Sequence, residues 1–184
     1  MLYRTAIHEA GHAVIGRAVT MACGGASIVP DDSLGRDGSA GHAVVASVDA
    51  SWRAWEEREK FRLYTSAVRG RIITVQSGRE AEAEILGPSL AWDDDDDDHR
   101  VAEALAEDLS IRPEDEPAAL ARLRRAARQL VRRHRADIET IAGMLMERGT
   151  LTGEEIDAAL PPGFMARPVT WALALAEVDD EEAS

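Results

Sequence analysis

The sequence predicts a mainly α protein of the α+β class, with a small β-hairpin or sheet after its first helix. Apolar residues recur at helical spacing along most of the 184 residues. β-Prone residues gather in two short stretches, 26–29 and 41–48, and the segment 30–38 between them is rich in turn-forming residues. A chain of this length is long enough to bury a substantial core in one domain.

The first helix is expected over about residues 5–22. Thr5 can cap this helix or stand in its first turn, and Gly24-Gly25 is expected to end it. Its residues are mostly apolar, as in a buried helix. Gly11 lowers helix propensity by about 1 kcal/mol relative to alanine, so its presence predicts that another segment approaches closely at this point.

A second helical region is expected over residues 51–86, where Gly70 and Gly78 are candidate breaks. Gly87-Pro88 stops this region, because proline cannot continue a helix. The following residues, 89–97, are expected to form a loop rich in acidic side chains.

A shorter helix is expected over residues 98–109, and the longest helical pattern spans 118–147. Gly149 is expected to end the long helix. Thr152, with Glu155 three residues later, has the sequence of a capping box, which predicts the start of a last short helix.

The charge of the chain is concentrated in two acidic runs. The net charge is −13, but Asp93–Asp98 contributes six acids and the stretch 177–182 contributes five. Without these eleven, 23 acids face 21 bases, so the body of the protein is nearly neutral and its charge gives no support for a nucleic-acid partner. We expect one domain over residues 1–168 and an acidic, partly disordered tail over 169–184.

Arginines cluster in the long helical pattern. We expect them to form a solvated face or to pair with acids of the same chain. They are Arg122, Arg124, Arg125, Arg128, Arg132, Arg133 and Arg135.

Cys23 is the single cysteine of the chain, which excludes an intramolecular disulfide. A reducing compartment, the cytoplasm, is the simplest expectation, and Cys23 itself is expected to be a small buried hydrophobe. No apolar run reaches the roughly 20 residues that cross a bilayer, so we expect no membrane segment.

Residues His8-Glu9-Ala10-Gly11-His12 form a His-Glu-x-x-His motif within the first helix. Histidines four residues apart lie on one face of a helix, about 5.4 Å apart along its axis, and can bind one zinc ion. Glu9 could then take a proton from a water bound to the metal. The motif predicts a metal-dependent hydrolase, most simply a peptidase; the alternative is a pair of ordinary surface or core-edge histidines.

A hydrolytic zinc site usually takes a third protein ligand and leaves one position for water. Carboxylates are the best candidates here. The run Asp93–Asp98 would suffer strong repulsion if all its carboxylates met in one place, so we expect at most one to bind the metal while the others face water. The alternatives are a solvated loop or weak binding of Ca²⁺ or another hard cation.

Four stretches in the same order resemble the peptidase domain of FtsH-type zinc metalloproteases, and the resemblance covers roughly residues 4–160. The first is the zinc motif with Ala13 and Val14. The others are Gly78-Arg79-Glu80-Ala81-Glu82-Ala83-Glu84-Ile85-Leu86-Gly87, Asp98-His99-Arg100-Val101-Ala102 and Thr150-Leu151-Thr152-Gly153-Glu154-Glu155-Ile156.

The resemblance implies a helical, zincin-like peptidase domain that binds Zn²⁺. His8 and His12 would be metal ligands, Glu9 the general base and Asp98 the third ligand. Asp97 is the fallback for Asp98, whose register we infer from the helical residues that follow it.

Glu82 matches an acid near the family's site and could orient a ligand histidine. His42 could line a substrate cleft beside a strand edge, although an exposed strand histidine is the simpler expectation. His99 would point about 100° away from Asp98 around a helix and is expected at the surface. His134 has no partner at metal-ligand spacing.

The sequence departs from the family in one large respect. It contains no Gly-x-x-x-x-Gly-Lys-Ser/Thr phosphate loop, so we expect no ATP hydrolysis by this chain. The prediction is a stand-alone, ATP-independent zinc metalloendopeptidase, lacking the AAA+ module, that cleaves peptides or unfolded protein segments. A homo-oligomer and a separate unfoldase are open alternatives for its partners. The competing function is a non-catalytic metal-binding scaffold or regulator that keeps the peptidase fold.

Overall fold

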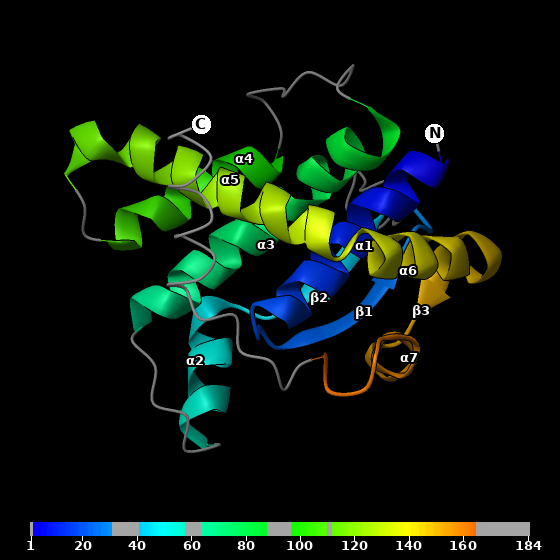
Figure 1. Ribbon diagram of the computed structural model, residues 1–184. Helices are drawn as coiled ribbons and strands as arrows, with labels where there is room; N and C mark the ends of the chain where they lie inside the picture. The colour runs from blue at the N-terminus through cyan, green and yellow to red at the C-terminus, as the bar shows by residue number, and fades with distance from the viewer. Residues whose placement is uncertain (1, 31–40, 58–63, 88–96, 110–111, 165–184) are drawn as a thin grey trace.

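The computed structural model describes residues 2–30, 41–57, 64–87, 97–109 and 112–164. Within these ranges the protein is mostly helical, with one small antiparallel sheet after the first helix (Figure 1), which confirms the predicted fold class. The elements in chain order are α1 (Leu2–Ala18), β1 (Cys23–Ser27), β2 (His42–Val45), α2 (Val48–Glu57), α3 (Tyr64–Leu86), α4 (Asp97–Ala106), α5 (Glu116–Arg133), α6 (Arg135–Arg148), β3 (Thr150–Leu151) and α7 (Gly153–Ala159). The segments Glu107–Leu109 and Pro113–Asp115 are short 3-10 turns.

Helix α1 is the centre of the core. It packs against α3, α6 and the sheet, and Figure 1 shows it running through the middle of the molecule. The predicted close approach at Gly11 is confirmed, because a Cβ atom there would lie 2.9 Å from both Ala81 Cβ and the Ser77 carbonyl oxygen on α3. A glycine at this position therefore lets the two helices pack closely.

The expected end of the first helix was wrong. Helix α1 stops at Ala18, and Thr20 then adopts a left-handed backbone with φ of 62°. Gly24 and Gly25 lie inside β1, where its register with β2 shifts. A Cβ atom on Gly25 would lie 2.2 Å from the Leu151 carbonyl oxygen, so this glycine is needed for strand contact rather than for ending a helix.

The sheet has the strand order β2-β1-β3, with both pairs antiparallel. Ala26 of β1 lies opposite Ala43 on one side and Leu151 on the other. The β1–β2 pair confirms the expected hairpin or sheet, whereas β3 was not predicted. Strand β2 is an edge strand of this sheet, and this position matters for the site.

Helix α3 runs unbroken through Gly70 and Gly78, so neither glycine is the break that the sequence suggested. The Gly70 carbonyl accepts a hydrogen bond from the Thr74 hydroxyl at 2.8 Å, within the regular helix. Gly78 is buried against α1. The expected region 51–86 instead contains two helices, α2 and α3, separated by residues 58–63, which lie outside the described part.

The long helix expected over 118–147 divides at His134, where φ is −106° and ψ is 20°. The two halves pack against different helices: α5 mainly contacts α3, and α6 mainly contacts α1. The division lets each apolar stripe reach its own partner. After α6, the predicted capping box is confirmed, because Thr152 Oγ1 accepts from the Glu155 N–H and the Glu155 carboxylate accepts from the Thr152 N–H.

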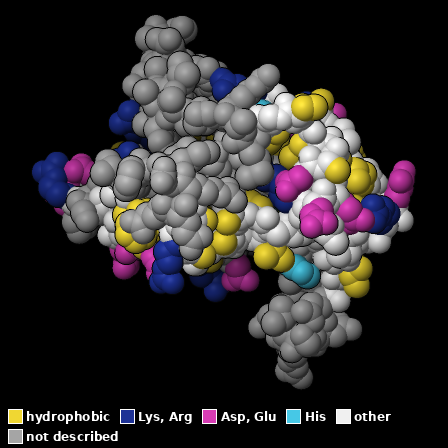
Figure 2. All heavy atoms as spheres, turned by 90° about the horizontal axis from the view of Figure 1, so that it is seen from below, with side chains coloured by type: hydrophobic (Ala, Val, Ile, Leu, Met, Phe, Trp, Pro, Cys, Tyr) yellow, Lys and Arg dark blue, Asp and Glu magenta, His cyan; other side chains and the backbone are white. Residues whose placement is uncertain are grey.

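Arg124, Arg128 and Arg132 of α5 pair with acids on α3, which is one of the two alternatives expected for the arginine cluster. Glu80 is completely buried and accepts from Arg124 Nε at 2.6 Å and from Arg128 Nε at 2.7 Å. Arg132 reaches Glu84 at 3.1 Å. On the described part of the face shown in Figure 2, acidic and basic side chains likewise lie next to one another.

Cys23 is partly rather than fully buried, and burial raises the pKa of its thiol to about 11. Across the described ranges, no helix combines the length and the apolar character that a bilayer crossing requires. The predicted domain boundary at residue 168 and the tail 169–184 lie outside the described part.

Candidate metal centre

Helix α1 presents His8 and His12 on one face, as the four-residue spacing predicted. Their Nε2 atoms lie 2.9 Å apart, and the two rings meet edge to face with centroids 4.6 Å apart. His12 is buried and His8 is partly buried. Both histidines therefore direct the same ring nitrogen towards a common point.

Asp98 reaches this point from the first turn of α4. Its Oδ2 atom lies 3.0 Å from His8 Nε2 and 3.1 Å from His12 Nε2. Tetrahedral bonds of about 2.0–2.1 Å to zinc would separate ligand atoms by roughly 3.3 Å, close to these distances. Two imidazole nitrogens and one carboxylate oxygen also form a donor set that zinc accepts, so the residues fit the metal.

Asp97, the fallback for the third ligand, borders the same cavity but does not join the group of ligand atoms. Its side chain is 95% exposed and lies 3.6 Å from Arg100 Nη2 on the same helix. In the part of the chain that the structure describes, the three side chains that meet with metal-ligand geometry are His8, His12 and Asp98. The residues Asp93 to Asp96 of the acidic run lie outside that part.

The other ring nitrogen of each histidine is held by α3. His8 Nδ1 lies 2.6 Å from Glu82 Oε1, and His12 Nδ1 lies 2.7 Å from the Thr74 carbonyl oxygen. Because a carbonyl oxygen accepts, the proton of His12 resides on Nδ1 and the Nε2 lone pair is free for a metal. The contact with the Thr74 carbonyl was not predicted, because a backbone acceptor cannot be recognised from the types of the residues.

Glu82 is buried and is itself held by two arginines. Arg4 pairs with its Oε2 atom, and Arg79 Nη1 lies 3.5 Å from the same oxygen. Burial works to raise the pKa of Glu82, but its contacts with His8 and Arg4 lower it below the usual value. An ionised Glu82 can accept the Nδ1 proton of His8, and this arrangement is the orienting geometry expected from the sequence.

The two carboxylates make this point attractive to positive charge. Burial works to lower the pKa of His8, but the hydrogen bonds to Asp98 and Glu82 raise it to about 10. Burial likewise works to raise the pKa of Asp98, but the neighbouring His12 and His8 hold it well below its usual range. A place that favours a proton this strongly is also suited to a divalent cation.

Gly78 leaves the space that an ion would need. A Cβ atom at this position on α3 would lie 2.7 Å from Nε2 of both His8 and His12. Any side chain at Gly78 would therefore occupy the point to which the ligand atoms are directed. The sequence suggested a helix break here, and the structure gives a different reason for the glycine.

Glu9 lies beside the two histidines in the same cavity. Its side chain is 6% exposed, and burial raises the pKa of Glu9 above its usual value, although the charges of His12 and His8 partly offset this effect. A carboxylate with a raised pKa is a stronger base near neutral pH. This environment suits the role of proton acceptor that the motif predicted for Glu9.

The cavity that contains these residues has a volume of about 320 Å³. Residues 41–43 and Val45, in and beside β2, form one side, and α3 contributes Arg71 and Val75. His42 is exposed, which was the simpler expectation, and it also lines this cavity. Sequence reasoning gave no role to Arg71, because one arginine among many carries no distinguishing pattern.

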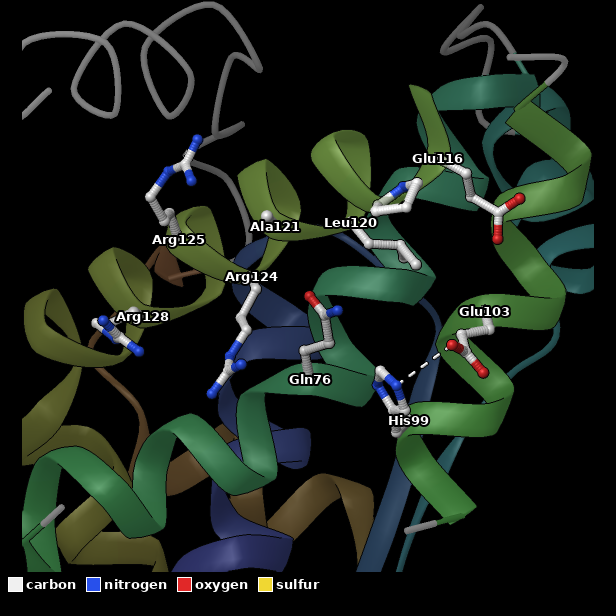
Figure 3. Close-up of a pocket in the computed structure, with 10 residues that line it drawn as sticks. Gln76, His99, Glu103, Glu116, Leu120, Ala121, Arg124, Arg125 and Arg128 are labelled. Atoms are coloured by element: carbon white, nitrogen blue, oxygen red, sulfur yellow. Dashed lines mark ion pairs between the residues drawn. The ribbon is translucent and has the colours of Figure 1, made fainter. Parts of the chain in front are cut away.

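A second cavity of about 650 Å³ lies between α3, α4 and α5 (Figure 3). His99 points into it from α4 and lies 3.3 Å from Glu103, so it faces away from the metal point occupied by its neighbour Asp98. His99 is thus partly buried rather than simply at the surface. Gln76 of α3 lines the same cavity.

No family model matches the chain. The chain is 29% identical over 180 residues to the ATP-dependent zinc metalloprotease FtsH 1 of Symbiobacterium thermophilum, covering 85% of this chain and 28% of that protein. It is 26% identical over 193 residues to the ATP-dependent zinc metalloprotease FtsH 3 of Sorangium cellulosum, covering 90% of this chain and 30% of that protein. The chain thus spans less than a third of either relative, and the similarity supports a distant relationship to FtsH zinc metalloproteases.

Proposed function

We propose that the chain is a zinc metallopeptidase that hydrolyses peptide bonds in peptides or unfolded protein segments without ATP. The observation that supports this most directly is the meeting of His8, His12 and Asp98 around one point, with Glu9 in the same cavity. The distant similarity to zinc metalloproteases supports the same assignment.

Each residue of the centre has a distinct part in the proposed reaction. His8, His12 and Asp98 would hold a zinc ion, which would supply Lewis acidity to a bound water and to the scissile carbonyl group. Glu9 accepts the proton of the attacking water and passes it to the leaving amine, and burial of Glu9 favours the first of these transfers.

The remaining contacts keep the histidines ready for the metal. Glu82 and the Thr74 carbonyl accept the Nδ1 protons of His8 and His12, which fixes both ring orientations and leaves Nε2 for the ion. Gly78 keeps the space between the rings open. These groups touch neither substrate nor reacting atoms, so they act by positioning.

We infer that the substrate binds in extended form along β2. This strand lies at the edge of its sheet and lines the cavity, so its outer backbone groups can pair with a peptide chain. Pairing of this kind depends on the backbone of the substrate rather than on its side chains. A folded domain cannot offer such a segment, so folded substrates would need a separate unfoldase.

The cellular setting is also a proposal. Both relatives are named as ATP-dependent, whereas this chain has no phosphate loop, so a separate unfoldase and a homo-oligomer are the partners we propose to look for. A reducing compartment, the cytoplasm, agrees with the single cysteine.

The test measures metal and cleavage together. The purified chain is loaded with zinc, its zinc content is determined, and a peptide library is incubated with it in the presence and absence of a chelator. We expect about one zinc per chain, chelator-sensitive cleavage, and a Glu9→Gln variant that keeps zinc but loses at least roughly 100-fold in kcat. Stoichiometric zinc without cleavage by the unchanged chain would favour the scaffold or regulatory function instead.

A further inference from the structure

Arg71 is a basic side chain in the wall of the metal cavity. It lies on α3 one helical turn before Val75 and about two turns before Gly78, so these three residues share one face of the helix. Arg71 lines the cavity together with Glu9 and Asp98. Helix α3 therefore contributes a cation to the proposed substrate cleft.

Among the residues that the structure describes, the Arg71 guanidinium forms no hydrogen bond and no ion pair. Burial lowers the pKa of Arg71, and the longer-range charge of Asp98 acts against this effect. Arg17 shows the contrast: it is 1% exposed, pairs with Asp157 and donates to the carbonyl oxygen of Ala13. A partly buried guanidinium without such partners costs free energy unless an anionic group arrives from outside.

The position of Arg71 along the cleft follows from its neighbours. Gly41 lies beside Glu9, since a Cβ atom on Gly41 would be 3.1 Å from Glu9 Cγ. Val45, at the other end of β2, pairs with Cys23. A Cβ atom on Gly16 would lie 2.6 Å from Cys23 Sγ and 3.2 Å from Thr74 Cγ2, so Cys23 and the Val45 end of β2 lie beside the part of α3 that carries Arg71.

Arg71 is also too far along α3 to act on the scissile carbonyl. Gly78 touches the ligand nitrogens, and seven residues of helix separate the two Cα atoms by about 10 Å. Helix side chains lean towards the N-terminus of their helix, which carries the guanidinium further from Gly78. The guanidinium is therefore placed to meet a substrate group beside the scissile bond.

We propose that Arg71 is a specificity-determining residue that binds a carboxylate of the substrate at the Val45 end of the cleft. The proposal rests on the proposed peptidase function. Guanidinium and carboxylate match in geometry and form two parallel hydrogen bonds. The carboxylate can belong to an aspartate or glutamate side chain or to the C-terminus of a peptide, and the experiment separates these two sources.

The experiment uses zinc-loaded full-length chain and synthetic peptides that carry one glutamate at successive positions on both sides of the scissile bond. Each peptide has a partner with glutamine at that position, and each pair is made with a free and an amidated C-terminus. A charge-assisted contact is worth roughly 1.5–3 kcal/mol, which predicts about 10- to 100-fold higher kcat/KM for one glutamate position over glutamine. Preference for the free C-terminus instead would identify the terminal carboxylate as the group bound.

Three variants test whether Arg71 causes the preference for glutamate over glutamine. Arg71→Gln should abolish the preference for glutamate over glutamine, and Arg71→Glu should favour lysine at the same position. Arg53→Gln, which changes an exposed arginine on α2 outside the cavity, should keep the preference. An unchanged glutamate-to-glutamine ratio in Arg71→Gln would overturn the proposal, and so would an equal fall in kcat for every peptide.

A binding measurement tests the carboxylate subsite independently of the proposed peptidase activity. The same peptide pairs are titrated against zinc-loaded Glu9→Gln protein, with and without Arg71→Gln, by fluorescence polarisation. If no peptide is cleaved by the unchanged chain but carboxylate peptides bind more tightly only when Arg71 is present, the peptidase assignment fails and the carboxylate subsite stands. Equal binding of both members of every pair overturns the subsite.

Discussion

At the scale of residues, the centre combines two histidines one helical turn apart with an aspartate from a different helix. His8 and His12 could be paired from the sequence because a helix fixes the relation of positions four apart. Asp98 lies ninety residues further along the chain, and no periodicity links it to α1. We preferred Asp98 to Asp97 because of the resemblance and the expected helical register of the residues that follow. The Thr74 carbonyl could not be predicted, because every residue has a backbone carbonyl.

The two neighbouring aspartates give a matched test of that register. Asp98→Ala should weaken zinc binding by at least about 100-fold, because loss of a direct ligand exceeds the 10- to 100-fold effect usual for outer contacts. Asp97→Ala should leave zinc binding unchanged, because this side chain is 95% exposed and faces Arg100. Zinc content after dialysis against a graded chelator series measures both. Equal losses in the two variants would show that the third ligand is assigned wrongly.

Gly78 offers a second test at this scale. Gly78→Ala places a methyl group 2.7 Å from both ligand nitrogens, so we expect zinc occupancy to fall while the helix remains folded. Gly143→Ala on α6 is the control, because nothing lies within 4 Å of its new Cβ atom. That control should keep zinc and gain roughly 0.5–1 kcal/mol in the free energy of unfolding. Circular dichroism with zinc analysis distinguishes the two, and full zinc occupancy in Gly78→Ala would contradict the geometry.

At the scale of elements, the apolar pattern located most helices but not their boundaries. The pattern of residues 118–147 continues across His134, so the sequence suggested one helix where α5 and α6 pack on different partners. Gly78 was a candidate break, but the helix continues through it and the absence of a side chain leaves space beside the nitrogens of His8 and His12. Strand β3 has two residues, too few for any alternation, and it exists because β1 already offers an edge beside it.

The capping box of α7 makes an element-scale prediction. Thr152→Ala removes the hydroxyl that accepts from the Glu155 N–H, and a lost N-cap costs about 1 kcal/mol of the free energy of unfolding. Thr140→Ala is the matched control, since the Thr140 hydroxyl only donates to the Ala136 carbonyl within α6. Urea denaturation of both variants measures the difference. A loss in Thr140→Ala as large as in Thr152→Ala would show that the cap is not what stabilises this end.

At the scale of the whole molecule, the centre is assembled by packing of distant helices. His8 and His12 come from α1, Asp98 from α4, and the groups that orient the rings from α3. A metal that binds only this arrangement stabilises the entire fold through mass action. Stability should therefore report metal binding even in a variant that cleaves nothing.

Zinc at about 100 times its dissociation constant should add roughly 2.7 kcal/mol to the free energy of unfolding and raise Tm by roughly 5–10 °C. At one fixed zinc concentration this shift in Tm should grow with pH, because protons compete less with zinc for His8. In the metal-free fold the pKa of His8 is raised to about 10 from 6.5, so its protonation stabilises the metal-free protein fully below pH 6.5 and progressively less towards pH 10. Scanning calorimetry at pH 6, 7.5 and 9 with and without zinc measures this, and a shift that shrinks as pH rises would contradict it.

The buried Arg17 ties the ligand-bearing helix to the far end of the described chain. Its guanidinium pairs with Asp157 and donates to the carbonyl oxygens of Gly24 and Gly153, so one cation joins α1, the first strand and α7. Removal of the residues after 149 would leave the buried Arg17 guanidinium without Asp157 and Gly153, and the sheet without Leu151. The helix that carries the proposed metal ligands is thus held in place by residues beyond position 149, and we expect the first hundred residues alone not to keep the centre assembled.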